Sequence, residues 1–135
     1  ETPVKGLITV TGQWPTGDYP TARGYVVYDG VISATGVKTA VDFGAAGAAG
    51  GRAFLFVRAL TGTATSADII VESATTAGGS YATEGTFTFT TSVPNAYAVD
   101  LSGVVNQFIR INTSDLGGAT NLSVTVIVAV TGVTK

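Results

Sequence analysis

The chain is built from short runs in which apolar and polar residues alternate. The clearest is NLSVTVIVAV, residues 121–130, whose even-numbered positions are all apolar from Leu122 to Val130. Its odd-numbered positions change from polar to apolar at Ile127 and Ala129. Alternation with a period of two places these two sets on opposite faces of a β-strand. We therefore predict a strand buried along one face and, near its end, on the second face as well.

Other runs share this texture and are separated by turn residues. Each is rich in β-branched or aromatic residues, which is typical of strands. They span residues 7–11, 24–29, 37–43, 52–60, 67–73, 85–91, 96–101 and 106–113. Segments such as YDG, AGGS and LGG between them are typical of turns, and no long window has the helical period. We predict an all-β protein, an antiparallel β-sandwich or jelly roll of about eight or nine strands.

The centre of the chain contains a strongly apolar run preceded by a glycine-rich segment. In the run RAFLFVRAL, residues 52–60, two phenylalanines alternate with a leucine and a valine, so we predict burial on both faces. The preceding GAAGAAGG, residues 44–51, has side chains too small to pack as a strand. This favours a mobile connecting loop, with a site of close backbone approach as the alternative, because glycine has no side chain.

The N-terminal part of the chain differs from the rest. Residues 11–24, TGQWPTGDYPTARG, contain the only tryptophan and two of the four prolines, and proline removes donors from a strand ladder. We predict two regions: residues 1–23 as an N-terminal arm with a Trp/Pro/Tyr loop, and residues 24–135 as the β-sandwich domain. The aromatic side chains of the loop either close one end of the sandwich or anchor a partner.

Composition narrows the class of protein. The 135 residues are 45% hydrophobic and only 12% charged, with a net charge of −2. A low charge with a high apolar content excludes a disordered chain, and no apolar run is long enough for a transmembrane helix. The 7 lysines and arginines are scattered, whereas a nucleic-acid binder clusters them. We expect one folded domain that binds neither nucleic acid nor membrane.

The residue types that most enzyme chemistry requires are missing. The chain has no histidine and no cysteine, which excludes Ser-His-Asp and Cys-His catalysis and leaves almost no donors for zinc or iron–sulfur clusters. We therefore predict no catalytic residue, no metal site and no cofactor. Glu72 and Glu84 stand at hairpin spacing, but we favour solvent-exposed positions for both over a glycosidase pair.

Two further polar sites have structural interpretations. NTSDLGG, residues 112–118, has the Asn, Asp and Gly of a calcium loop but lacks acidic ligands at every second position, which favours a turn after a strand. Arg110 alternates with Ile109 and Ile111. We predict that it faces outward, with Asp100 or Asp115 as a candidate partner.

Two long stretches of the chain resemble a module of tailed-bacteriophage virion proteins. They read GGRAFLFVRALTGTATSADIIVESATTAGGSYATEGTFTF and AVDLSGVVNQFIRINTSDLGGATNLSVTVIVAVTG, and the resemblance covers residues 36–133. It follows the order of an apolar strand, a Thr/Gly turn into IVESA, a G-x-F-T strand, an F-I-R strand and a last strand that alternates Thr and Val. Such modules occur in head decoration (cement) proteins and in tail-associated proteins. Where they carry an Arg-Tyr pair, this chain has Gln107-Phe108, so the contact of that arginine is not carried over.

The resemblance implies a jelly-roll-like sandwich, often trimeric, that clamps neighbouring subunits of the major capsid protein on the outer capsid surface of the virion. A chain with few charges and much apolar surface is also more typical of an adhesive protein than of an enzyme. We therefore predict a non-enzymatic capsid decoration protein that forms a homo-oligomer, with a trimer favoured. The alternatives are a subunit of a tail tube or extracellular filament, and a carbohydrate-binding module that uses the rings of Trp14, Tyr25, Tyr28 and Tyr81.

The predicted partner interface has two parts. The first is the N-terminal loop, at Trp14, Tyr19 and Arg23, because aromatic and arginine side chains are common anchors of interfaces. The second is the half-apolar face of the last strand, at Ile127 and Ala129, where we expect a neighbouring subunit.

Overall fold

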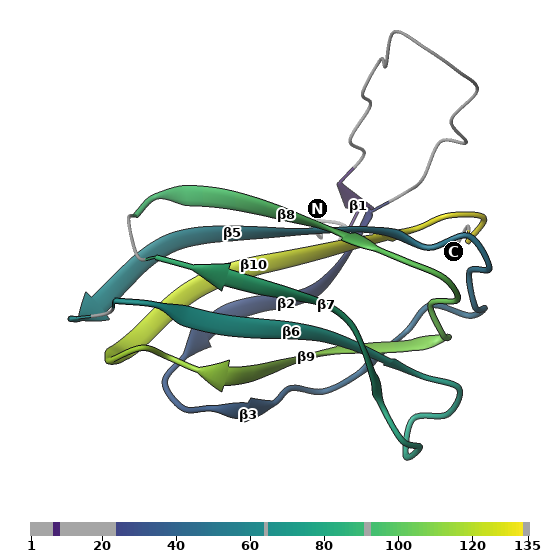
Figure 1. The fold of residues 1–135 in the computed structure, drawn as a ribbon, viewed down its shortest axis with the longest axis horizontal. Coiled ribbons are helices and arrows are strands. Elements are labelled where there is room, and N and C mark those ends of the chain that lie inside the picture. Colours follow the sequence, from purple (N-terminus) through teal and green to yellow (C-terminus); the bar gives the residue numbers. More distant parts are fainter. Residues whose placement is uncertain (1–6, 9–23, 64, 91–92, 134–135) are drawn as a thin grey trace, which may run out of the picture.

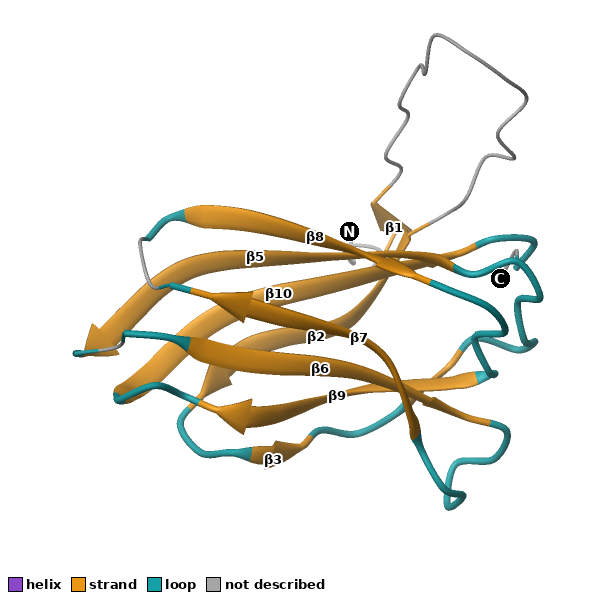
Figure 2. Cartoon of the chain, in the orientation of Figure 1, coloured by secondary structure: helices purple, strands orange, loops and turns teal. Residues whose placement is uncertain are grey.

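The structure, a computed structural model, describes residues 7–8, 24–63, 65–90 and 93–133. Within these ranges the chain consists of strands and loops without a helix (Figure 2). The strands are β1 (Leu7–Ile8), β2 (Gly24–Ile32), β3 (Gly36–Val37), β4 (Val41–Asp42), β5 (Gly51–Gly62), β6 (Ala67–Ala74), β7 (Ala82–Phe89), β8 (Asn95–Leu101), β9 (Phe108–Asp115) and β10 (Ala119–Val130). The predicted all-β class is confirmed, and the predicted run 37–43 is divided between β3 and β4.

The strands form two antiparallel sheets that make a β-sandwich (Figure 1). One sheet has the order β1-β2-β10-β5-β8, and the other has the order β3-β9-β6-β7, with β4 also paired to β9. The pairs β2·β10, β4·β9, β5·β8 and β6·β7 are nested in the sequence, each inside the one before. From β2 to β10 the chain therefore forms one long antiparallel hairpin. Its two arms run side by side and pass from one sheet to the other as a pair.

The inner faces of the two sheets form one hydrophobic core. In β5 the alternate residues Ala53, Leu55 and Val57 are buried, and in β10 every second residue from Leu122 to Val130 is buried. The facing sheet contributes alternate residues that include Ile69, Val71, Phe87, Phe89, Ile109 and Ile111. Burial of each such Val, Leu, Ile or Phe stabilises the fold by about 1.5–3 kcal/mol. A shift of one residue in register would expose all the buried side chains of a strand, so the alternation specifies how the strands pair.

The glycine-rich segment before β5 lies against the backbone of neighbouring strands. Gly47 is buried and exchanges two backbone hydrogen bonds with Val105, of 2.8 and 2.9 Å. A Cβ at Gly47 would lie 2.1 Å from Val130 Cγ1, and a Cβ at Gly51 would lie 2.1 Å from the carbonyl oxygen of Ala129. Close backbone approach, the alternative interpretation of this segment, is thus confirmed at both glycines.

Candidate functional site

The outer face of the sheet that contains β10 carries its side chains in rows across the strands. Antiparallel partners lie directly opposite one another, so the register of β8, β5, β10 and β2 shows which residues share a row. One row consists of Ala98, Phe54, Ile127 and Val26, in this order from β8 to β2. All four are apolar, and we call them the apolar row.

Ile127, the centre of this row, is covered by its own chain. Its side chain retains only 3% of its exposure although it lies outside the main core cluster. A Cβ at Gly24 would lie 2.7 Å from Ile127 Cγ2, so this methyl group extends over the glycine. Ile127 is therefore covered within a single chain, and its contact with a neighbouring subunit stays a prediction. Ala129, half-buried, follows on the same face.

The other predicted interface residues, Trp14, Tyr19 and Arg23, lie outside the described residues. Their contact with a partner therefore stays a prediction.

The exposed apolar surface lies one strand away from Ile127, on β5 and β8. Phe56 is 40% exposed and Phe54 is half-buried, whereas Leu55 and Val57, which alternate with them, are buried. The prediction that the run 52–60 is buried on both faces is therefore wrong. The cross-strand partners of the two phenylalanines are exposed alanines of β8, Ala96 and Ala98, and a methyl group is too short to cover a ring.

This exposed surface was absent from the predicted interface, although the sequence contains a signal for it. In the run AYAVDL the larger Tyr97 and Val99 alternate with alanines. The larger side chains pack against the core, which leaves the alanines on the outside. A strand with alanine on its outer face leaves its neighbour's large side chains exposed.

Two ion pairs border the apolar row. On one side, Arg52 Nε lies 3.4 Å from Asp100 Oδ1. On the other side, Arg58 Nη2 lies 2.9 Å from Asp29 Oδ1, which also accepts a hydrogen bond of 2.8 Å from the Thr125 hydroxyl. All four charged side chains are exposed, so each pair stabilises the fold by only about 0–1 kcal/mol. They give the face equal numbers of positive and negative charges.

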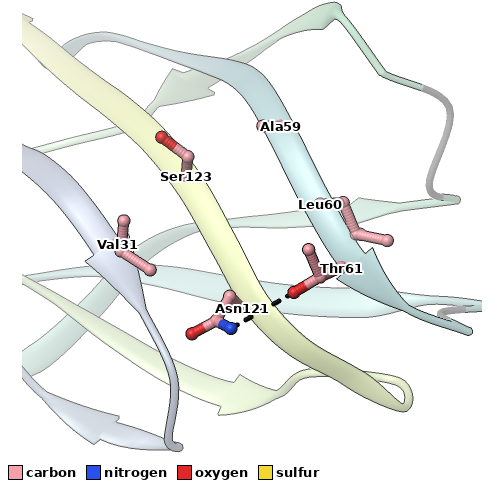
Figure 3. A pocket seen from close by; sticks show the side chains of 6 residues that line it. All are labelled: Val31, Ala59, Leu60, Thr61, Asn121 and Ser123. Carbon is pink, nitrogen blue, oxygen red and sulfur yellow. Dashed lines mark hydrogen bonds between the residues drawn. The ribbon is translucent and has the colours of Figure 1, made fainter.

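A hollow of about 230 Å³ lies on the same outer face, near the end of β5 (Figure 3). Its lining comes from β2, β10 and β5 and consists of Val31, Ala59, Leu60, Thr61, Asn121 and Ser123. Asn121 Nδ2 donates a hydrogen bond of 3.2 Å to Thr61 Oγ1 at its edge. The hollow is smaller than the roughly 300–1,000 Å³ of most ligand pockets, and no ionisable side chain lines it. It therefore offers a shape for contact and no group for acid–base chemistry.

The outer face of the other sheet carries a polar cluster instead. We call Glu72, Arg110, Asn112 and Tyr81 the Glu72 cluster. Arg110 Nε donates to Glu72 Oε2 at 2.8 Å, and Asn112 Nδ2 donates to Glu72 Oε1 at 3.0 Å. The Arg110 guanidinium also lies 3.7 Å from the centre of the Tyr81 ring. Glu72 is only 8% exposed, so its charge is held by two donors beneath a covering of longer side chains.

The Glu72 cluster corrects two predictions. The solvent-exposed position predicted for Glu72 is wrong, because this carboxylate lies directly opposite Arg110 in the β6·β9 register. Arg110 does face outward as predicted, but its partner is neither Asp100 nor Asp115. The pairing joins residues 38 positions apart, so only the fold brings them together.

Glu84 belongs to a separate group of contacts. It accepts a hydrogen bond from the hydroxyl of Ser73, which is fully buried and accepts a bond of 2.9 Å from the backbone N–H of Asn106. Glu72 and Glu84 are therefore held by different partners. A buried serine hydroxyl that already has its partners stabilises the sandwich rather than presenting a nucleophile.

The turn predicted at residues 112–118 is confirmed in its C-terminal half. β9 ends at Asp115, whose Oδ1 accepts a hydrogen bond of 2.8 Å from the N–H of Gly117. Within the described part of the chain, no three acidic, histidine or cysteine side chains group as metal ligands would. The same part contains no helix with the length and hydrophobicity that a bilayer span requires.

Comparison with known proteins adds no relative to this description. No protein-family model matches the chain, and neither a curated protein nor a solved structure matches it significantly. The outer sheet face with its apolar row, its exposed Phe56 and its two ion pairs is therefore characterised by its geometry alone.

Proposed function

We propose that this chain is a non-enzymatic structural subunit of a tailed-phage virion, which decorates the head and stabilises it by clamping neighbouring subunits of the major capsid protein. The observation that supports an assembly role is the outer face around Phe56, where an aromatic ring 40% exposed stands beside exposed alanines. Contiguous apolar surface of this kind on a folded protein is typical of an interaction site.

The nested strand pairs support a jelly-roll topology, which the resemblance to phage decoration modules implies. A rolled-up hairpin gives two four-stranded layers in the order β2-β10-β5-β8 and β3-β9-β6-β7. The jelly roll is an architecture that capsid-type proteins use to build closed β-layers with few free edges. The resemblance of residues 36–133 to phage decoration modules points in the same direction.

The carbohydrate-binding alternative loses support because the tyrosine rings are engaged elsewhere. Tyr25 packs edge-on against the buried Phe43, with 5.2 Å between ring centres. Tyr28 packs against the core, and its hydroxyl donates to the carbonyl of Val31. Tyr81 is stacked with Arg110. A sugar platform needs free ring faces, whereas these three rings pack against other side chains of the same chain.

The mechanism of stabilisation would be mass action. A protein that binds the assembled shell and not its dissociated subunits stabilises the shell by RT ln(1 + [L]/Kd), about 2.7 kcal/mol at a concentration of 100 Kd. No side chain needs to react for this effect. The proposal therefore requires binding surfaces only, and we assign the shell contact to the N-terminal arm and its loop.

The test is co-sedimentation of the purified chain with undecorated capsids of the phage that encodes it, followed by thermal disruption of the shells. We expect saturable binding and a higher disruption temperature. A variant that lacks residues 1–23 should keep its circular dichroism spectrum, because the described strand pairing that it removes is the two-residue ladder of β1, and should lose shell binding. Absence of binding by the full chain would overturn the proposed function, and spontaneous growth of long polymers would favour a tube or filament subunit.

A further inference from the structure

The outer face that carries the apolar row has an unusual combination of surface chemistry. It is apolar at its centre, around Phe54 and Phe56, and it has one Arg–Asp pair on each side. The charges of these two pairs, which belong to the described residues, therefore cancel. A partner with a strong charge of either sign would gain nothing from this face, so the partner should also be apolar at its centre and mixed in charge at its borders.

A second copy of the same face has these properties. We infer that two copies of this chain pair through this face, packed sheet against sheet about a two-fold axis that runs along the apolar row. In an isologous contact every residue faces the same patch on the other copy, so the patch must be complementary to itself. This inference goes beyond the proposed function, because it concerns the contact between copies rather than the contact with a shell.

The register of the strands shows that the face meets this requirement. A two-fold axis along the row places Phe54 against its own counterpart. It also exchanges the two neighbouring rows, one of which contains Phe56 and Asp29, whereas the other contains Arg52 and Gly24. Phe56 of one copy then faces Arg52 of the second, and Asp29 faces Gly24.

This pairing brings Arg52 of each copy to Phe56 of the other, a favourable contact that the two-fold axis makes twice. The Arg52 guanidinium already lies 5.8 Å from the centre of the Phe54 ring in its own chain, and the second copy would offer it the exposed ring of Phe56. Cations over aromatic faces attract each other, more strongly when water is excluded. Among the described residues, no like charges oppose each other in this arrangement. The low net charge of the chain, −2, adds little long-range repulsion between copies.

The pairing also has a definite stoichiometry. When this face is occupied by a two-fold contact, assemblies contain an even number of copies. The trimer implied by the resemblance would need a different, heterologous contact. The mass of the protein in solution therefore distinguishes the two arrangements directly.

The first experiment measures the mass of the full chain by light scattering and sedimentation equilibrium over a range of concentrations. We expect twice the chain mass of 13.6 kDa, with dissociation on dilution. The variant Phe56→Asp should weaken pairing about 30-fold or more, as the loss of a central aromatic anchor does. Val37→Asp is the matched control, since Val37 is an apolar residue 52% exposed on the other sheet, and should pair normally. A monomer or a trimer of the unmodified chain would overturn the inference.

A second experiment does not depend on the fold of the Phe56 variant. The chain has no cysteine, so a single introduced cysteine reports only its own surroundings. The two-fold axis places Ala98 near its counterpart, so Ala98→Cys should form dimers with a short bismaleimide, and Val37→Cys should not. Equal cross-linking of both variants, or none of Ala98→Cys at paired concentrations, would overturn the inference. Shell binding is measured separately, so pairing without shell binding would overturn the proposed function alone.

Discussion

The two outer faces of the sandwich differ in which kind of side chain they bury. On one sheet a charged residue, Glu72, is only 8% exposed, because Arg110 and Asn112 donate to it and the Arg110 side chain lies on Tyr81. On the other sheet an apolar residue, Phe56, is 40% exposed, because the neighbours across β8 are alanines. Burial on an outer face thus depends on the length of the neighbouring side chains as well as on polarity.

This difference separates a polar cluster whose buried charge has partners in the same chain from an apolar region that stays exposed. The Glu72 cluster satisfies its buried charge with groups of the same chain, as buried polar groups require. The region around Phe56 leaves apolar surface in water, at a cost of about 25 cal/mol per Å² that a partner would remove. The first face is therefore expected to contribute to folding, and the second to association.

Of the substitutions considered, that of Arg110 in the Glu72 cluster should lower the free energy of unfolding most. Arg110→Met leaves the buried carboxylate of Glu72 without its charged partner, so we expect a loss of about 3 kcal/mol in the free energy of unfolding, measured by urea denaturation. The double variant Glu72→Gln/Arg110→Met removes the buried charge and should regain more than half of this loss. A loss below about 1 kcal/mol for Arg110→Met would show that the ion pair is not needed to hold Glu72.

Substitution of Ile127 tests whether this central residue of the apolar row is buried within one chain. Ile127→Ala should lower the free energy of unfolding by about 2–3 kcal/mol, because it opens a cavity in a packed site. The control Val31→Ala changes a residue that is 57% exposed on the same face and should stay within about 0.5 kcal/mol. If the loss at Ile127 occurred only at concentrations at which copies associate, a partner and not the chain itself would cover it.

Removal of the Tyr81 ring from the Glu72 cluster should have a smaller effect on stability. Tyr81→Ala takes away the aromatic surface on which Arg110 lies, and we expect a loss of about 1 kcal/mol in the free energy of unfolding. Tyr81→Phe keeps the ring and loses only the exposed hydrogen bond to the carbonyl of Ala77, so it should lose much less. Equal losses in the two variants would mean that the hydroxyl, and not the stacking, is responsible.

The smallest effect on folding is expected at Phe56. Phe56→Thr, measured at a concentration at which the chain is a monomer, should change the free energy of unfolding by less than about 0.5 kcal/mol. The neighbouring Leu55→Thr is the control, since Leu55 is fully buried and a hydroxyl there has no water. A large loss at Phe56 would place this side chain in the fold and weaken the contrast between the two faces.

Several features of the fold were predictable because they depend on residues that are close in sequence. Alternation with a period of two predicted the strands, and in β10 it predicted the buried set from Leu122 to Val130. The turn after β9 was predictable as well, because Asp115 bonds to the N–H of a residue two positions further on. Such local patterns need no knowledge of which strand lies beside which.

The candidate site was less predictable because each part of it depends on long-range register. The sequence of β5 has large apolar side chains on both faces, yet Leu55 and Val57 face the second sheet, whereas Phe56 lies in a row that ends in alanine. Arg110 had two nearby acids as candidates and pairs with Glu72, which the β6·β9 ladder places opposite it. The sequence by itself determined the strand class and the composition of each face. Only the tertiary structure decided which face is covered, because burial depends on the neighbours that distant strands bring.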